Sequence, residues 1–245
     1  MTPPRFSLVV PCYNEARSLP DLIRRCRFVA EEGEGEVILV DNGSTDDTPH
    51  VLCSLFEKES GARVRTIRVE VNRGYGFGIT SGLAEATAPL IGWTHADLQT
   101  DPIDLLRGLS LITDFHQPFL LKGRRYGRPV SDRFFTAGMS MFETALFGRR
   151  MTDINSQPTL FPRELMEIWG TPPRDFSLDL FTMHAALLAG YEVVRFPVLV
   201  APRRFGTSSW NVDFAAKRRF IKRTLDYSFT LRRALRSAPD EVSTR

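Results

Sequence analysis

The chain has 245 residues, of which 42% are hydrophobic and 25% are charged, a composition typical of a globular domain and not of a disordered chain. Its formal net charge of +3 is too small to indicate a nucleic-acid partner by itself. One α/β domain of this length is ordinary and can bury a sizeable core.

The first half of the chain alternates predicted strands and helices. Apolar runs of strand length lie at residues 6–11, 36–40, 64–71 and 90–94. Helical spacing or helix-start signals lie at residues 18–30, after the polar turn at 42–46, from the glycine-rich loop at 72–78 through 86, and from 101. Such repeated units predict an α/β fold with a Rossmann-like, mostly parallel central sheet and helices on both faces.

The second half is less regular. It contains predicted strands at residues 119–123 and 193–200, predicted helices at 132–147 and 176–189, and an irregular segment at 153–161. The C-terminal segment is basic and has apolar residues at helical spacing, namely Phe214, Ile221, Leu225 and Phe229. We expect one domain over residues 1–212 and a basic, helical tail over residues 213–245.

The N-terminus, the cysteines and the basic tail bear on where the protein is located in the cell. The N-terminus lacks the apolar run of a signal peptide, and no stretch approaches the roughly 20 apolar residues of a membrane-spanning helix. The three cysteines form no CxxC pair, which favours a reducing cytoplasm. The basic tail suits a helix on an anionic membrane surface, and equally suits a helix that packs on the domain. We expect a cytoplasmic protein, with peripheral contact to the inner membrane face as one alternative and no nucleic-acid partner.

Four polar segments follow predicted strands and are candidates for a ligand site. They are residues 11–15, 41–44, 72–74 and 95–99. Open parallel sheets bind ligands beyond the carboxyl ends of their strands, so these segments should converge. Turn formation alone would explain residues 42–44 equally well, but it explains the four together poorly. Among these residues we expect ligand contacts from Asn72, Gly74 and Ala96.

His95 and Asp97 are candidate metal ligands. They lie two residues apart, so at the end of an extended strand they would point to the same side. An imidazole beside a carboxylate suits Mn²⁺ better than Mg²⁺, because nitrogen ligands favour softer ions. Such a metal would bridge the two phosphates of a diphosphate donor and stabilise the departing diphosphate. The alternative for His95 is a hydrogen-bonded structural histidine.

The glycine-rich loop does not match a dinucleotide-binding fingerprint. Gly74 and Gly76 would be followed by a third glycine at position 79, where the chain has Ile79. The loop also follows the third predicted strand and not the first, and it lacks a P-loop lysine. Close packing of a helix on a strand is the better explanation of these glycines, and a nicotinamide dehydrogenase is disfavoured.

Five segments resemble family 2 glycosyltransferases of the GT-A fold. They are VVPCYNEA, VDNGSTDDT, NRGYGFG, HADLQTDP and RRFGTSSW, in this order. Within that family they most resemble dolichyl-phosphate mannose synthases and related polyprenyl-phosphate glycosyltransferases, from residue 6 to about residue 210. The resemblance implies a GT-A domain that takes a sugar from a GDP- or UDP-sugar with the help of Mn²⁺ or Mg²⁺.

The resemblance also implies roles on the nucleotide side of the site. Pro11, Tyr13, Asn14 and Glu15 match the segment that holds the donor nucleotide. Asp41 matches the acid that contacts the base or the ribose.

Further matching positions lie around the diphosphate. Asp97 matches the metal-binding aspartate of the DxD-type motif, and Gln99 matches the glutamine beside it, so both would contact the metal and the donor. Arg124 and Arg203 match arginines near the donor diphosphate, and Arg133 matches one near the acceptor phosphate. Arginine suits these places because its fork donates two hydrogen bonds to phosphate oxygens.

Several positions depart from the pattern of these synthases. His95 replaces the first aspartate of DxD, Ala137 replaces a phosphate-binding serine, and Ser209 replaces the lysine of the closing loop. Residues 153–158 also differ from the usual sequence. The nucleotide side is therefore better supported than the acceptor side, and a non-catalytic sugar-nucleotide-binding protein is the alternative of another class.

We expect an inverting single displacement, in which the acceptor attacks the anomeric carbon while the metal and Arg203 stabilise the leaving diphosphate. The implied acceptor is a polyprenyl phosphate at the cytoplasmic face of the membrane, and an ionised phosphate needs no strong base. A hydroxyl acceptor on a glycan or a small molecule would need one. Asp179 is the candidate base, with an ordinary helix-surface or capping acid as the alternative.

Overall fold

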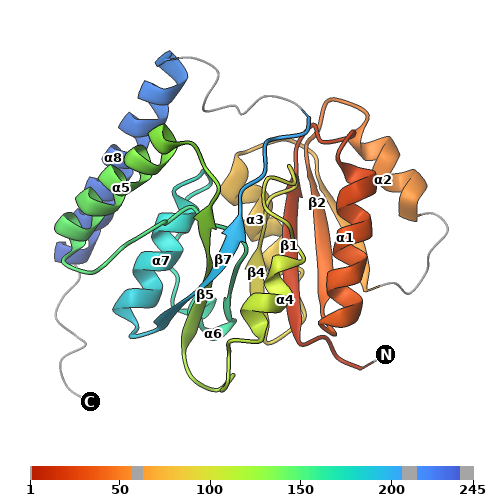
Figure 1. Ribbon diagram of the computed structural model, residues 1–245, viewed down its shortest axis with the longest axis horizontal. Helices are drawn as coiled ribbons and strands as arrows, with labels where there is room; N and C mark the ends of the chain where they lie inside the picture. Colours follow the sequence, from red (N-terminus) through yellow and green to blue (C-terminus); the bar gives the residue numbers. More distant parts are fainter. Residues whose placement is uncertain (1, 57–62, 206–213, 238–245) are drawn as a thin grey trace. The chain divides into compact units, whose positions relative to one another are not determined.

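The computed structural model describes residues 2–56, 63–205 and 214–237. The fold divides into two compact units. The first unit consists of Met1–Pro129 and Asn155–Gly206, and the second of Val130–Ile154 and Thr207–Arg245. The elements of both units carry the labels of Figure 1.

The first unit is built on a seven-stranded sheet in the order β3-β2-β1-β4-β6-β5-β7. The strands are β1 (Phe6–Cys12), β2 (Glu36–Asn42), β3 (Val64–Val69), β4 (Leu90–Trp93), β5 (Phe119–Tyr126), β6 (Thr159–Pro162) and β7 (Glu192–Leu199). Only β6 runs antiparallel to its neighbours, so the other six point in one direction. The predicted mostly parallel α/β sheet is confirmed.

Helices cover both faces of this sheet. They are α1 (Leu19–Glu32), α2 (Thr48–Phe56), α3 (Tyr75–Ala84), α4 (Asp104–Leu109), α6 (Glu164–Glu167) and α7 (Leu178–Leu188). On one face, Leu8 and Val10 join a buried cluster with residues of α1, α2 and α4. Val9 points to the other face, where Gly82 of α3 lies against it. Side chains of a strand alternate between faces, so this pattern is what a sheet buried on both sides requires.

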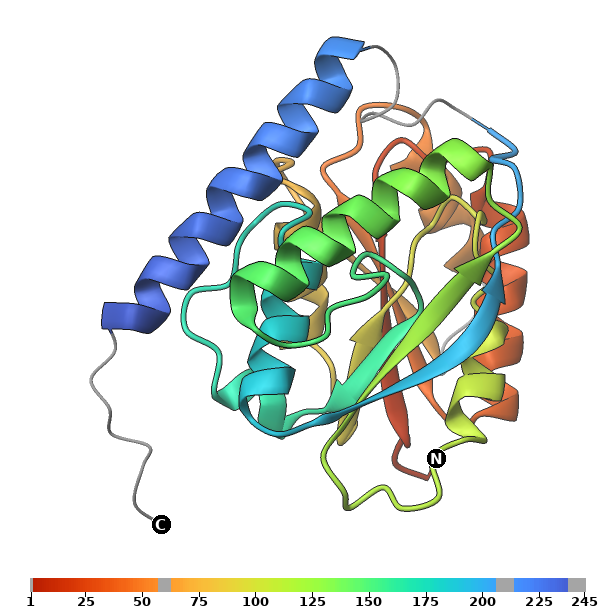
Figure 2. The ribbon, with the colours of Figure 1, turned by 60° about the vertical axis from the view of Figure 1, so that its left-hand side comes forward.

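An aromatic chain places α7 on the same face as α3. Trp93, the register partner of Val9, packs edge-on against Phe161 at 5.7 Å between ring centroids. Phe161 contacts Trp169 at 5.7 Å, and Trp169 contacts Phe181 of α7 at 5.5 Å. Figure 2 shows α1 and α4 on one side of the sheet and α7 on the other.

Two predicted boundaries are wrong. The segment predicted as a loop over residues 72–78 already becomes helical at Tyr75, because α3 begins directly after Gly74. The segment predicted as irregular over residues 153–161 ends in β6, which pairs with β4 on one side and β5 on the other. A strand of four residues is too short to show a period in sequence, and its partners are distant in the chain.

The second unit contains α5 (Val130–Phe147) and α8 (Phe214–Ser237). Phe142 packs edge-on against Phe229 at 5.8 Å, and Ser228 donates a hydrogen bond of 2.6 Å to the Oε1 atom of Glu143. The helix expected in the tail is thus present as α8, while the domain boundary at residue 212 stays a prediction. The side chain of Phe214 lies outside the described residues.

In the part of the chain that the structure describes, no helix is both long enough and apolar enough to cross a bilayer.

Candidate active site

The ends of β1 and β2 are tied together by Asn14. This residue adopts a left-handed backbone conformation with φ of 57°. Its Oδ1 atom accepts a hydrogen bond of 2.8 Å from the backbone N–H of Thr45, and its own N–H donates to the Ser44 hydroxyl at 3.1 Å. The next residue, Glu15, donates its backbone N–H to the Thr48 hydroxyl at 2.9 Å. Two segments that the sequence predicted at strand ends therefore form one edge of a common site.

Asp41 lies inside this edge, near the end of β2. It is buried, and its Oδ1 atom accepts a hydrogen bond of 3.0 Å from the backbone N–H of Ser44. The Oδ2 atom lies 3.8 Å from the Nε atom of Arg68 and accepts no hydrogen bond from the described residues. A buried carboxylate oxygen in this situation can accept a hydrogen bond from a ligand.

Arg203 brings three distant segments together. Its Nη2 atom donates a hydrogen bond of 2.8 Å to Glu15, which follows β1. The same atom lies 3.9 Å from the Oδ2 atom of Asp97, which follows β4. Burial raises the pKa of Glu15 above its usual value, although Ser18 and Arg203 oppose the shift. The cluster therefore gathers two carboxylates and one guanidinium at the carboxyl edge of the sheet.

The segment after β4 bends sharply around Asp97. Leu98 is left-handed with φ of 56°, and the Asp97 Oδ1 atom accepts a hydrogen bond of 3.1 Å from the backbone N–H of Gln99. The strand ends at Trp93, so the predicted extended arrangement of His95 and Asp97 is wrong. The ring of His95 instead stacks on Tyr75 with 5.4 Å between ring centroids.

The donor set around Asp97 fits a cation that takes most of its ligands from elsewhere. The described residues contain no group of three or more His, Cys, Asp or Glu side chains that could hold a metal ion. The Oδ2 atom of Asp97 nevertheless already faces a positive charge, that of Arg203. A divalent ion held by Asp97, with His95 and Gln99 nearby, would need the phosphate oxygens of a ligand to complete its coordination.

The glycine-rich segment is shaped by close packing. A Cβ atom on Gly74, whose φ is 111°, would collide with the carbonyl oxygen of Arg174. A Cβ on Gly78 would come within 2.8 Å of the Asn42 side chain. Asn72 accepts a hydrogen bond of 2.8 Å from the Gly74 N–H, and Asn42 donates one of 3.1 Å to the Gly74 carbonyl. Asn72 and Gly74 therefore shape the loop. The predicted packing of a helix on a strand holds for Gly78 against Asn42 of β2, whereas Gly74 packs against the segment before α7.

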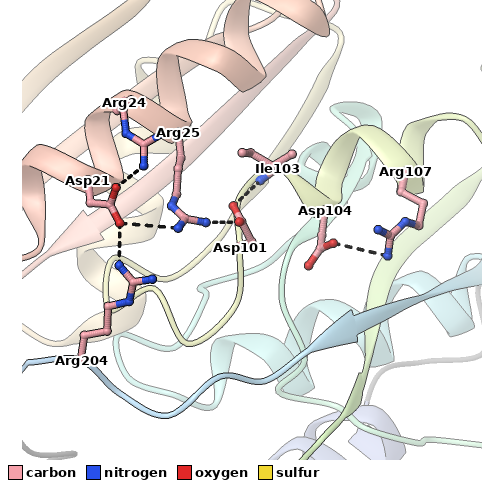
Figure 3. A network of polar contacts seen from close by, with 8 residues as sticks. All are labelled: Asp21, Arg24, Arg25, Asp101, Ile103, Asp104, Arg107 and Arg204. Atoms are coloured by element: carbon pink, nitrogen blue, oxygen red, sulfur yellow. Dashed lines mark hydrogen bonds and ion pairs between the residues drawn. The ribbon is translucent and has the colours of Figure 1, made fainter.

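An ion-pair network includes Arg204, the next residue after Arg203 in the chain (Figure 3). Arg204 lies 2.9 Å from Asp21 of α1, and Asp21 also pairs with Arg25 at 3.5 Å. Arg25 in turn pairs with Asp101, just beyond the Asp97 turn. The charges of Arg24, Arg25 and Arg204 lower the pKa of Asp21, with the Arg24 hydrogen bond as the largest cause. The network therefore joins Arg204, next to Arg203, and Asp101, just after the Asp97 turn, to helix α1.

A sequence model described as glycosyl transferase family 2 matches residues 7–162, which include the ends of β1, β2 and β4 described above. The chain belongs to this family. It is a glycosyltransferase, and the alternative of a nicotinamide dehydrogenase is excluded.

Solved structures share the GT-A fold of this glycosyltransferase. One is the mannosyltransferase PcManGT from Pyrobaculum calidifontis in complex with GDP-Man and Mn²⁺, with a TM-score of 0.66 at 21% identity. The match covers 97% of this chain and 66% of that protein. Another is glucosyl-3-phosphoglycerate synthase from Mycobacterium tuberculosis with Mn²⁺, UDP and phosphoglyceric acid, at 0.69 and 19% identity, covering 94% of this chain and 78% of that one. At these identities the similarity establishes the fold alone.

The remaining predicted donor contacts of the glycosyltransferase lie around this edge of the sheet. Pro11 is half-buried within β1, Tyr13 follows it with 45% of its surface exposed, and Ala96 is buried. Arg124 is exposed near the carboxyl end of β5. Their roles toward the donor stay predictions.

The structure gives less support to the residues predicted on the acceptor side. Arg133 is exposed on α5 and belongs to the second unit, so its role stays a prediction. Ser209 lies outside the described residues. Asp179 is 1% exposed, so the alternative of an ordinary helix-surface acid is wrong. It pairs instead with Lys122, a fully buried residue of β5 that no sequence pattern singled out.

Proposed function

We propose that this glycosyltransferase transfers a hexosyl group from a GDP- or UDP-sugar with inversion, assisted by a divalent metal ion. The observation that carries the proposal is the contact of Arg203 with both Glu15 and Asp97 at the carboxyl edge of the sheet. An acidic pair with an arginine can accept a metal ion and a diphosphate together, because the added positive and negative charges balance.

Asp97, His95 and Gln99 are the residues that would hold the metal. The two solved structures described above contain Mn²⁺ together with GDP-Man or UDP, which supports Mn²⁺ as the ion. When bound, the ion would neutralise charge on the leaving diphosphate. Arg203 would add two donated hydrogen bonds to the same oxygens, and its side chain is already oriented by Glu15.

The nucleotide would bind along the joined ends of β1 and β2. Asp41 offers one carboxylate oxygen free of hydrogen bonds from the described residues, which suits a ribose hydroxyl or a base N–H. Tyr13 offers an exposed ring on which a base can stack. Asn14 already holds the two strand ends in one geometry, so little ordering would remain for binding.

For the acceptor, we propose a polyprenyl phosphate taken from a membrane surface. The support is an apolar stripe on α5, formed by Val130, Phe134 and Met141, with exposures of 62%, 75% and 74%. Their spacing of four and seven residues puts them on one face of the helix. Arg133 on α5, and Arg218 and Lys222 on α8, are exposed cations of the same unit. An apolar face with flanking Lys and Arg suits an anionic lipid surface.

A soluble acceptor is the second candidate. The synthase from Mycobacterium tuberculosis is found with phosphoglyceric acid, a small phosphate-bearing molecule with one free hydroxyl. An acceptor of that kind would need neither a membrane nor the α5 stripe.

A ligand screen tests the donor part of this proposal. Thermal unfolding is followed with GDP, UDP, GDP-mannose and UDP-glucose, each with and without Mn²⁺. We expect the nucleotides of one base, guanine or uracil, to raise the unfolding temperature, because a ligand that binds the folded state stabilises it. We expect Mn²⁺ to increase this rise in temperature. No stabilisation by any of these nucleotides would contradict the proposed donor. Incubation of the chosen sugar nucleotide with a polyprenyl phosphate or with 3-phosphoglycerate then separates the two acceptors.

A further inference from the structure

A buried charge pair lies within the first unit, outside the Arg203 cluster. The side chain of Lys122 is 0% exposed and that of Asp179 is 2% exposed. The Lys122 Nζ atom donates to Asp179 Oδ1 at 3.1 Å and to the Thr159 hydroxyl at 2.9 Å. Removing two charges from water is costly, and an apolar pair of the same size would often be at least as stable. The presence of these charges therefore calls for an explanation other than stability.

The pair is connected to the active site through Gln157 and Tyr75. The Gln157 Nε2 atom donates to Asp179 Oδ1 at 2.8 Å and lies 3.4 Å from the Tyr75 hydroxyl oxygen. Asp179 thus determines which end of the Gln157 amide faces it, because a carboxylate accepts only from the N–H₂ end. Lys122 donates to the same oxygen and so holds the carboxylate in place.

Tyr75 connects Gln157 to the segment that carries Asp97. Its ring stacks on Phe176 on one side, at 4.5 Å and 15°, and on His95, at 5.4 Å and 27°. Burial, with smaller effects of the charges of Asp179 and Asp97, raises the pKa of Tyr75 well above its usual value. The phenol therefore stays neutral and acts as a stacking surface.

We propose that Lys122, Asp179 and Gln157 are positioning residues that fix the ring of Tyr75 and, through it, the ring of His95 for donor binding. The inference rests on the proposed function, because it assumes that the His95–Asp97 segment receives the donor and its metal. In this role Asp179 orients a neighbour and does not deprotonate an acceptor.

Histidine resonances give the first test. The chain has four histidines, so their imidazole C–H signals can be resolved by NMR, and a His95→Gln variant identifies the relevant one. Gln157→Leu keeps the side-chain volume but removes both hydrogen bonds. It should move the His95 signal, because the ring current of Tyr75 changes, and it should weaken donor binding about tenfold in calorimetry with Mn²⁺. Gln117→Leu is the matched control, since replacing this exposed surface amide should change neither the His95 signal nor the donor affinity.

The charge pair gives the second test. Lys122→Met and Asp179→Leu each leave one buried charge unpaired and should lower stability, whereas the double variant should regain it. If the pair positions Tyr75, the double variant still shows a displaced His95 signal and about tenfold weaker donor binding, since Gln157 has lost its acceptor.

Two outcomes would overturn the inference. One is a folded Gln157→Leu protein with the wild-type His95 signal and donor affinity. The other is a double variant that binds the donor as tightly as the wild-type protein does. If that variant is active, the pair is purely structural. If it is inactive, Asp179 is a catalytic base. If the wild-type protein binds no sugar nucleotide, the proposed function fails, but the His95 signal still tests the network.

Discussion

Arg203 occupies the position of a counter-ion in the site. It contacts Glu15 at 2.8 Å and Asp97 at 3.9 Å, so one guanidinium serves two carboxylates. A divalent ion at Asp97 would replace Arg203 as the partner of this carboxylate. The guanidinium of Arg203 could then bind a diphosphate. The residue that balances charge in the free protein would then stabilise the leaving group in the reaction.

Asp97→Asn tests this assignment. The change keeps the shape of the side chain and removes its charge, so the transfer rate should fall about a hundredfold, in line with the roughly 3 kcal/mol typical of one charge-stabilising group. The Mn²⁺-dependent part of donor binding should weaken with it, as measured by calorimetry. Asp47→Asn, at an exposed turn position, is the control and should leave both quantities unchanged. Unchanged turnover in Asp97→Asn would remove the metal assignment.

Helix α3 depends on glycines that permit close approach. A Cβ atom at Gly76 would collide with the backbone carbonyl of Pro173, and that of Asp175 would be only 2.8 Å away. Backbone atoms cannot move aside as a flexible side chain can. The glycines therefore mark the place where α3 and the segment before α7 touch.

Gly76→Ala should lower the free energy of unfolding by about 1–3 kcal/mol, the usual range for overpacking. The matched control is Gly138→Ala on α5, where an added Cβ meets nothing within 4 Å. That change should raise the helix stability of α5 by roughly 0.5–1 kcal/mol, because alanine is the better helix former. Urea unfolding followed by circular dichroism measures both. Equal effects of the two substitutions would contradict the packing argument.

The pairing of α5 with α8 should depend on pH. Glu143 is buried, and burial raises its pKa to about 7 despite the hydrogen bond from Ser228. An acid whose pKa is higher in the folded state favours folding when protonated, so its contribution is largest below about pH 4.5 and is lost as the pH rises toward 7. The amides of α5 should accordingly exchange hydrogen faster at pH 7.5 than at pH 5 after correction for the intrinsic rate. Glu143→Gln should remove this dependence, and a variant that keeps it would show that another group titrates.

Membrane contact is a question for the whole molecule, because it requires a surface and not a single contact. The exposed apolar stripe of α5 lies in the same unit as the cationic α8. The wild-type protein should float with vesicles that contain anionic lipid. Phe134→Glu combined with Met141→Glu should weaken this binding tenfold or more, since burying each such side chain contributes about 1.5–3 kcal/mol.

Phe28→Glu is the control for this experiment. Phe28 is an exposed aromatic residue of α1, 46% exposed, in the other unit. Its replacement adds the same charge without touching the stripe and should leave vesicle binding nearly unchanged. Absence of vesicle binding by the wild-type protein would favour a soluble acceptor.

The sequence by itself determined the α/β class and predicted the location of the candidate site. Periodicity is a local property, so the strands of the first half and the residues at their ends could be read from consecutive positions. The rule that parallel strands bind ligands at their carboxyl ends then brought Asn14, Asp41 and Asp97 to one edge.

Only the tertiary structure decided which distant residues meet there. Arg203 contacts Glu15 across 188 positions of the chain, and Lys122 contacts Asp179 across 57. Strand β6, inserted antiparallel between β4 and β5, could not be predicted for the same reason. Local preferences do not encode such pairings, because the partners come within reach of each other only once the chain has folded.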